Sequence, residues 1–299
     1  MTELYFLVGP AGSGKSTWAQ RLVENYLGIE WISSDRVRGE LWGDENEQRD
    51  PHKVFEIVNS RALEHLKNGH SVIYDSTGLS SKNRINFLRM IKENQIKCKK
   101  FCICFFEPYE ILCERQNLRE RHVPFEVIKR QLKSFEVPCY GEGWDEIFRI
   151  SNFHNENKLI SIVTENRYTP HDNPHHSSDI GEHMERANSY AITHYGPDVA
   201  TLAYYHDIGK PFCKTFINSK GIPDEVAHYY GHENYGAYLI GLYYPSSKNL
   251  DWLTVANVVQ WHMIPWRYGE KKKAVIFNRL GDTITNYILK VHECDKAGH

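Results

Sequence analysis

The chain has 299 residues, of which 41% are hydrophobic, 13% aromatic and 25% charged, and its formal net charge is -2. This composition excludes a disordered or collagen-like chain, and the length is sufficient for one large or two ordinary domains with buried cores. The near-neutral charge removes a global electrostatic argument for nucleic-acid binding, although a local basic patch would be compatible with it.

The sequence carries no sign of a membrane or secreted protein. No apolar run approaches the roughly 18 residues of a spanning helix, and the first residues lack the basic-then-apolar order of a signal peptide. The seven cysteines include no CxxC pair, which favours neither a disulfide framework nor a thiolate zinc site. We therefore expect a soluble, cytoplasmic protein without a membrane partner, whose cysteines are reduced.

The first half alternates apolar runs with amphipathic stretches of helical length. The runs predict strands at residues 4–8, 29–33, 71–75, 99–106 and 158–163. Continuous apolar strands separated by helices are typical of a parallel sheet covered on both faces. The sequence therefore predicts an α/β domain over residues 1–166.

The second half has a different pattern. Residues 165–178 contain two prolines and two asparagines without periodicity, which predicts a linker, placed at 167–171. Helical periodicity follows at 180–194, 233–244 and 253–263, with no comparable strand pattern. We expect an all-α domain over residues 172–299. Eleven of the 16 histidines lie from His171 onward, which indicates a second kind of chemistry.

A complete GxxxxGK[ST] motif lies between the first predicted strand and a predicted helix. Small residues let backbone N–H groups turn toward phosphate oxygens at the positive end of the helix. Lys15 adds a positive charge there, and the Ser16 hydroxyl can ligate Mg²⁺. The sequence predicts an ATP and Mg²⁺ site made by Gly9, Gly12, Ser13, Gly14, Lys15, Ser16 and Thr17.

Charged residues follow the next two predicted strands. A carboxylate at the carboxyl end of a parallel strand faces the ligand crevice, so Asp35 could accept a proton from an acceptor hydroxyl. Arg36 or Arg38 could then hold an acceptor phosphate. Alternatively, Asp35 only caps the next helix. Asp75 closes the following strand and could support Mg²⁺ or an arginine.

Residues 115–130 carry the three arginines Arg115, Arg119 and Arg121 before Pro124, which breaks a helix. Such a strip can close over a triphosphate as a lid, or it can be a solvated helical face. Together, the P-loop, the Asp-x-x-Arg motif at 35–38 and the Asn-x-x-x-Arg-x-Val-Pro segment at 117–124 resemble the 5′-polynucleotide kinase module of nucleic-acid end-healing enzymes. The resemblance covers residues 1–165.

This resemblance implies roles for individual residues. Lys15 and Ser16 would serve the ATP phosphates and the metal ion. Asp35 would be the general base for a polynucleotide 5′-OH, and Arg38 would contact the acceptor phosphate. The lid arginine would be one of two residues that the spacing does not separate, Arg119 and Arg121.

The second half contains His206-Asp207-Ile-Gly-Lys210 after an apolar and aromatic stretch. An adjacent imidazole and carboxylate suit a borderline metal ion, and an aspartate can bridge two ions. Helices in a bundle can direct further ligands into one pocket, although a lone histidine is usually a hydrogen-bonded core residue. The further candidates are His183, His232, His262 and Asp295. The residues that compete with them, and that we expect to be structural or to support the ligands from behind, are His176, His228, His292 and Asp282.

The ordered pattern H…HD…H…H…D, with a Gly-Lys pair after HD, resembles the HD-domain metal phosphohydrolase superfamily. The resemblance implies two divalent transition-metal ions, such as Mn²⁺, Ni²⁺, Co²⁺ or Zn²⁺. Their ligands would be His183, His206, Asp207, His232, His262 and Asp295. Lys210 would bind the substrate phosphate, or would be a solvated lysine near a turn.

Both halves together resemble the bifunctional HD–Pnk end-healing family. The resemblance implies 5′-OH phosphorylation of RNA or DNA ends, removal of 3′-phosphate or 2′,3′-cyclic phosphate, and a nucleic-acid ligase acting downstream. One departure is that the kinase module comes first here. A small-molecule kinase fused to a nucleotide phosphohydrolase is the first alternative. The second is a nucleotide-sensing regulator, which would not need Asp35 as a base.

Overall fold

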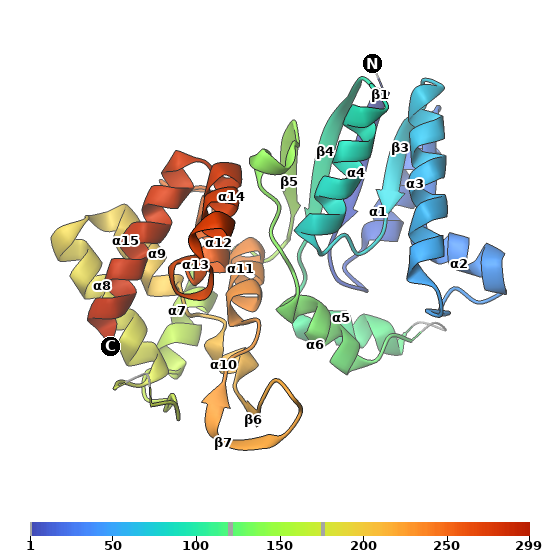
Figure 1. Cartoon of the computed structure of the whole chain (residues 1–299). Coiled ribbons are helices and arrows are strands. Elements are labelled where there is room, and N and C mark those ends of the chain that lie inside the picture. Colours follow the sequence, from blue (N-terminus) through green and yellow to red (C-terminus); the bar gives the residue numbers. More distant parts are fainter. Residues whose placement is uncertain (1, 119–121, 175–176) are drawn as a thin grey trace. The chain divides into compact units, whose positions relative to one another are not determined.

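The computed structural model describes residues 2–118, 122–174 and 177–299. The chain divides into two compact units (Figure 1). The N-terminal unit comprises Met1–Gln131 and Glu142–Ile150, and the C-terminal unit comprises Leu132–Gly141 and Ser151–His299. The division therefore falls earlier than the expected boundary at 166, and a short excursion of the chain, residues 132–141, packs with the second unit.

A five-stranded parallel sheet forms the centre of the N-terminal unit, as the sequence predicts. Its order is β2-β3-β1-β4-β5. The strands are β1 (Thr2–Val8), β2 (Ile29–Ser33), β3 (Ser71–Asp75), β4 (Cys98–Phe105) and β5 (Glu146–Ile150). Because the strands are parallel, β1, β2 and β3 end at the same edge, where the P-loop, Asp35 and Asp75 follow them.

The prediction of a strand at 158–163 is wrong. These residues lie in α7 (Glu156–Glu165), and the fifth strand is Glu146–Ile150 instead. Within α7 the buried residues are Leu159, Ile162 and Val163, a spacing that places them on one helical face. An apolar run of six residues fits a strand and a helix equally well by composition, and packing on the C-terminal unit decides between them.

Helices cover both faces of the sheet (Figure 1). The helices of this part of the chain are α1 (Lys15–Asn25), α2 (Ser34–Trp42), α3 (Pro51–Lys67), α4 (Ser81–Glu93), α5 (Tyr109–Asn117) and α6 (Phe125–Lys133), of which α5 and α6 lie below the sheet in Figure 1 rather than on a face. On one face, Ala19 of α1 joins a buried cluster with Leu7 and Ile73. On the other, Phe87 of α4 lies with its ring centroid 4.6 Å from that of Tyr74. The alternation of side chains along β1 and β3 supplies both faces.

A buried ion pair holds the loop that follows β3. Arg84 of α4 is completely buried, and its Nη2 and Nε lie 2.7 and 2.8 Å from the two carboxylate oxygens of Glu142. Its Nη1 also donates to Gly78 O at 2.8 Å. Trp144 Nε1 donates to the same carboxylate at 2.9 Å. The pair therefore ties α4, the loop at 78 and the segment before β5 together.

Replacing Arg84 by methionine should lower the free energy of unfolding of the N-terminal unit by about 3–5 kcal/mol, because it leaves the Glu142 carboxylate buried without its cation. Arg61→Met is the matched control, because the Arg61–Glu40 pair is exposed and should cost at most about 1 kcal/mol. Urea denaturation of both variants measures the difference. Equal losses would contradict a structural role for the buried pair.

The C-terminal unit is mainly helical. Its helices are α7, α8 (Ile180–His194), α9 (Pro197–Tyr205), α10 (Lys210–Cys213), α11 (His232–Tyr243), α12 (Trp252–Trp261), α13 (Ile264–Arg267), α14 (Glu270–Leu280) and α15 (Asp282–Gly298). The expectation of an all-α unit is wrong in one place, where β6 (Thr215–Ile217) and β7 (Pro223–His228) pair antiparallel. Asn218 Oδ1 accepts from the backbone N–H of Lys220 and Ile222, and these bonds close the hairpin turn.

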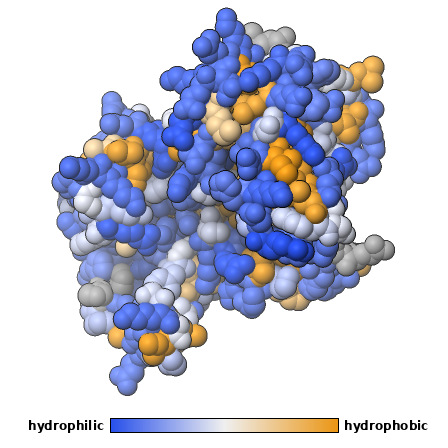
Figure 2. All heavy atoms as spheres, turned by 45° about the vertical axis from the view of Figure 1, so that its right-hand side comes forward, coloured by the Kyte–Doolittle hydropathy of each residue, from blue (hydrophilic) through white to orange (hydrophobic). Residues whose placement is uncertain are grey.

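The surface and the thiols follow ordinary patterns. Within the described residues, no helix combines the length and the apolar character needed to cross a bilayer. The face in Figure 2 is mostly hydrophilic, with apolar side chains in separate groups. All seven cysteines lie within the described residues, none of them forms a disulfide, and six are buried.

Candidate functional site

The loop between β1 and α1 has the backbone that the P-loop motif predicts. Gly12 has a φ of 88°, and a Cβ there would lie 2.6 Å from Gln116 Nε2. Only glycine fits such a position without strain. Lys15 is buried, and its Nζ donates to the carbonyls of Gly9 and Pro10 at 2.8 Å each. The lysine therefore holds the loop in a closed turn at the start of α1.

Ser16 contacts the carboxylate at the end of β3. Its Oγ donates to Asp75 Oδ2 at 3.0 Å, and Trp31 Nε1 donates to the same oxygen at 3.0 Å. Burial raises the pKa of Asp75, while the Lys15 charge and these hydrogen bonds oppose that rise. Of the other predicted loop residues, Ser13 is buried and Thr17 is exposed. Asp75 thus lies beside the hydroxyl that the motif assigns to Mg²⁺.

Asp35 and Arg38 form one unit at the start of α2. Ser33 caps this helix, because its Oγ accepts from the Asp35 N–H at 3.2 Å, so the Asp35 carboxylate is not the cap. Asp35 Oδ1 instead accepts from Arg38 Nη1 at 2.6 Å. The Asp35 side chain remains 41% exposed, whereas Arg38 is 9% exposed. Arg36 turns away and stacks on the Trp31 ring at 3.8 Å. Arg38, rather than Arg36, shares its surroundings with Asp35.

The lid segment is divided into two helices, α5 and α6, on either side of the segment that includes Pro124. The two lid candidates, Arg119 and Arg121, lie outside the described residues. Arg115 of α5 donates to Gly12 O and to Glu107 Oε1, both at 2.9 Å. The sequence does not predict this contact, since nothing in the arginine spacing indicates that one of them supports the P-loop.

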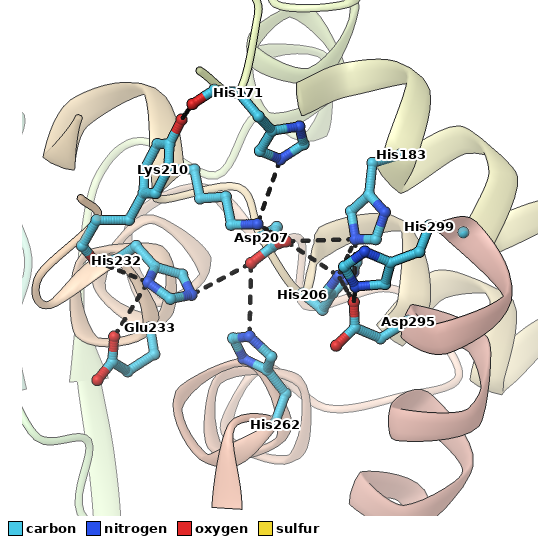
Figure 3. A network of polar contacts seen from close by, with 12 residues as sticks. His171, His183, His206, Asp207, Lys210, His232, Glu233, His262, Asp295 and His299 are labelled. Carbon is cyan, nitrogen blue, oxygen red and sulfur yellow. Dashed lines mark hydrogen bonds and ion pairs between the residues drawn. The ribbon is translucent and has the colours of Figure 1, made fainter. Parts of the chain in front are cut away.

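In the C-terminal unit, the six predicted metal ligands lie together (Figure 3). His183 is in α8, His232 begins α11 and Asp295 is in α15, whereas His206-Asp207 directly follows α9 and His262 directly follows α12. Their ligand atoms form two groups, each within 4.8 Å. The first is His183, His206, Asp207 and Asp295, and the second is Asp207, His232 and His262. Asp207 is common to both groups.

The two carboxylate oxygens of Asp207 face different groups. Oδ2 lies 3.4 Å from His183 Nε2 and 3.2 Å from His206 Nε2. Oδ1 lies 3.2 Å from His232 Nε2 and 3.5 Å from His262 Nε2. The carboxylate is therefore oriented as a bridge between two sets of imidazole nitrogens.

Close packing of the backbone makes this orientation possible. A Cβ on Gly209 would lie 2.0 Å from His232 O. Glycine after His206-Asp207-Ile therefore lets the turn approach the start of α11. The glycine of the Gly-Lys pair is therefore needed for steric reasons, in addition to being part of the sequence motif.

The ring orientation of three histidines directs lone pairs into the cluster. Nδ1 of His206, His232 and His262 each lies 2.6–2.8 Å from the carbonyl oxygen three residues earlier. A carbonyl only accepts, so Nδ1 carries the hydrogen and Nε2 of a neutral ring has a lone pair. Among the described residues, Nε2 of His232 and of His262 has no hydrogen-bond partner. A proton or a metal ion between these buried nitrogens and the Asp207 carboxylate would satisfy both groups.

The buried carboxylates of Asp207 and Asp295 favour positive charge in the cluster. Burial opposes a charge on His206, but Asp207 and Asp295 raise its pKa to about 10. Burial also opposes the charge of Asp295, yet its hydrogen bonds to His183 and His206 hold its pKa below the usual range. A proton can supply part of this positive charge. Imidazole and carboxylate groups are also the ligands that divalent transition metals prefer. The residues present therefore fit a pair of such ions.

Lys210 is buried rather than solvated, and its Nζ lies 2.7 Å from Asp207 Oδ2. His171, which the sequence assigned to the linker, is also buried, and its Nε2 lies 3.3 Å from Lys210 Nζ. An aperiodic segment with prolines gave no signal for a site residue. Of the four competing residues, His228 pairs with Asp224, His292 packs on Trp266, Asp282 is exposed, and His176 lies outside the described residues.

Comparison with known proteins gives one family match. Residues 4–138 match the model of the AAA_33 family, described as an AAA domain. With the P-loop and the five-stranded parallel sheet, the N-terminal unit is a P-loop, kinase-like α/β domain.

Three solved structures illustrate the similarity. A chain of a Pnkp1/Rnl/Hen1 complex is 26% identical over 38% of this chain and 38% of its own length, with a TM-score of 0.35. A fungal RNA kinase is 16% identical, with 55% and 82% covered and a TM-score of 0.38. Shikimate kinase from Acinetobacter baumannii is 21% identical, with 56% and 96% covered and a TM-score of 0.33. The chain thus spans well under half of the complex chain that it matches.

Proposed function

We propose that this protein heals nucleic-acid ends with two active sites. The N-terminal unit would phosphorylate a 5′-OH end of RNA or DNA with ATP and Mg²⁺. The C-terminal unit would remove a 3′-phosphate or a 2′,3′-cyclic phosphate with two divalent metal ions. The observation that carries the proposal is that one chain combines a P-loop with two ligand groups that share Asp207. Both ends would then be suitable for a ligase, which is the partner we expect.

The kinase half rests on the residues around the P-loop. Asp75 bonds the Ser16 hydroxyl, and it lies close enough to Asp35 for their charges to interact. Asp35 is thus near the Mg²⁺ position and exposed enough to meet an acceptor hydroxyl. In this role it takes the proton of the attacking 5′-OH, while Arg38 binds an acceptor phosphate and Lys15 binds the ATP phosphates.

The phosphohydrolase half rests on the Asp207 cluster. When bound, two divalent ions supply Lewis acidity for the phosphate and for the attacking water. The chain's own residues hold and space that pair, with the Asp207 carboxylate between the two histidine groups. Lys210 lies next to the cluster with a positive charge for the substrate phosphate. No nucleophilic side chain is required.

A labelled-substrate assay tests both halves. The purified protein is incubated with γ-labelled ATP and 5′-OH oligonucleotides of increasing length, with a nucleoside 3′-monophosphate as the small acceptor. It is then given 3′-phosphate and 2′,3′-cyclic-phosphate oligonucleotides with Mn²⁺, Ni²⁺, Co²⁺ or Zn²⁺. We expect labelled 5′ ends and metal-dependent 3′-OH ends. Indifference to acceptor length would favour the small-molecule kinase, and binding without turnover would favour the nucleotide sensor.

Arg38→Ala should raise the KM for a 5′-OH oligonucleotide by about tenfold or more while the KM for ATP changes little, because a charge-assisted contact to the acceptor phosphate is lost. Arg36→Ala is the matched control, since this neighbour stacks on Trp31 instead of pairing with Asp35. Steady-state kinetics with each substrate varied in turn gives both constants. A parallel rise of both KM values in Arg38→Ala would indicate a structural arginine.

A further inference from the structure

His171 and Lys210 form a buried pair at the edge of the Asp207 cluster (Figure 3). Lys210 Nζ lies 2.7 Å from Asp207 Oδ2 and 3.3 Å from His171 Nε2. Both residues are at most 5% exposed. An ammonium only donates, so the imidazole nitrogen and the carboxylate oxygen are its acceptors. The ammonium is therefore placed between His171 and the bridging carboxylate.

The protonation of His171 fits this arrangement. Its Nδ1 lies 2.6 Å from Ser178 O, which requires a hydrogen on that nitrogen. A neutral ring with its hydrogen on Nδ1 has its lone pair on Nε2, the nitrogen that lies 3.3 Å from the Lys210 ammonium.

The segment that carries His171 is fastened to the β6–β7 hairpin and to Lys214. Asp172 O accepts from Ala227 N at 2.8 Å, and Asn173 Nδ2 donates to Ala227 O at 2.9 Å. Asp172 Oδ2 pairs with Lys214 Nζ at 2.7 Å. These contacts hold the backbone on the C-terminal side of His171, and the bond from Nδ1 to Ser178 O orients its ring toward Lys210.

The position of the ammonium has an electrostatic consequence. It contacts Asp207 Oδ2, the same oxygen that faces His183 and His206. A divalent cation held by that group would lie close to the Lys210 charge, and in a buried site the repulsion is weakly screened. We propose that His171 is a positioning residue that holds Lys210 on Asp207 and thereby lowers the affinity of the cluster for divalent cations. The inference rests on the proposed metal site.

Isothermal titration calorimetry of the chelator-treated full chain with Mn²⁺ tests this inference without any activity assay. Lys210→Met should bind Mn²⁺ about tenfold more tightly than the parent, because the competing charge is gone. His171→Leu should raise the affinity by about threefold, because the ammonium loses its support. His171→Gln should stay near the parent value, since its amide oxygen can accept from Lys210.

A double variant separates an indirect role from a structural one. In the Lys210→Met background, His171→Leu should have no further effect on Mn²⁺ affinity, because His171 acts through Lys210. The inference is overturned if His171→Leu acts equally in both backgrounds or in neither, or if Lys210→Met does not bind Mn²⁺ more tightly. If the parent fails to bind Mn²⁺, or Asp207→Asn binds it equally well, the proposed metal site itself is wrong.

Discussion

In an Asp207→Asn variant the rate of 3′-end hydrolysis should fall by about 10³-fold or more, because the two metal ions contribute several kcal/mol of transition-state stabilisation. Asparagine keeps the shape of the side chain but removes the negative charge and offers only one oxygen. In the parent, Oδ1 and Oδ2 of Asp207 lie 3.2–3.5 Å from four histidine Nε2 atoms, two in each ligand group. The variant has no carboxylate that can contact both groups. The release of 3′-OH ends with saturating Mn²⁺ measures the loss.

Asp224→Asn is the matched control for this variant. Asp224 lies in the same unit and pairs with a histidine, His228, at 3.0 Å, but it is outside both ligand groups. We expect it to hydrolyse 3′-phosphates at the parent rate. Parent-like hydrolysis by Asp207→Asn would remove the cluster from the reaction.

Asp35→Asn should lower kcat for 5′-phosphorylation by about 10²–10⁴-fold while the KM for ATP stays close to that of the parent, because the general base is lost and the P-loop is unchanged. Lys15→Ala should instead weaken both ATP binding and transfer, since it removes the cation that also holds Gly9 and Pro10. Asp44→Asn, at an exposed turn, is the control. A near-normal kcat for Asp35→Asn would mean that Asp35 only pairs with Arg38.

The sequence predicted the local elements of the N-terminal unit better than its boundary. Four of the five predicted strands overlap observed strands, because long apolar runs between helices have few alternatives in a parallel sheet. The run at 158–163 was ambiguous, and tertiary packing made it α7. The excursion of residues 132–141 depends on contacts such as that between Val137 N and Gln260 Oε1, more than a hundred residues apart. No local pattern encodes such a pairing.

Some residues of the candidate site could be predicted from the sequence and others could not. The six ligands could be proposed because their order and residue types form a pattern, and the structure brings them to one cluster. His171 and Arg115 could not, since the relevant contact of each is long-range, to Lys210 and to Gly12 O respectively. The steric need for glycine at 209 can be recognised only when the position of the start of α11 is known.

The most direct test of the two-site account measures both activities on the same purified samples of the parent, Lys15→Ala and Asp207→Asn. Circular dichroism first establishes that each variant is folded. We predict that Lys15→Ala loses 5′-phosphorylation and keeps 3′-end hydrolysis within a few-fold of the parent, and that Asp207→Asn does the reverse. Loss of both activities from either folded variant would contradict the account, because it would show that the two reactions share one site.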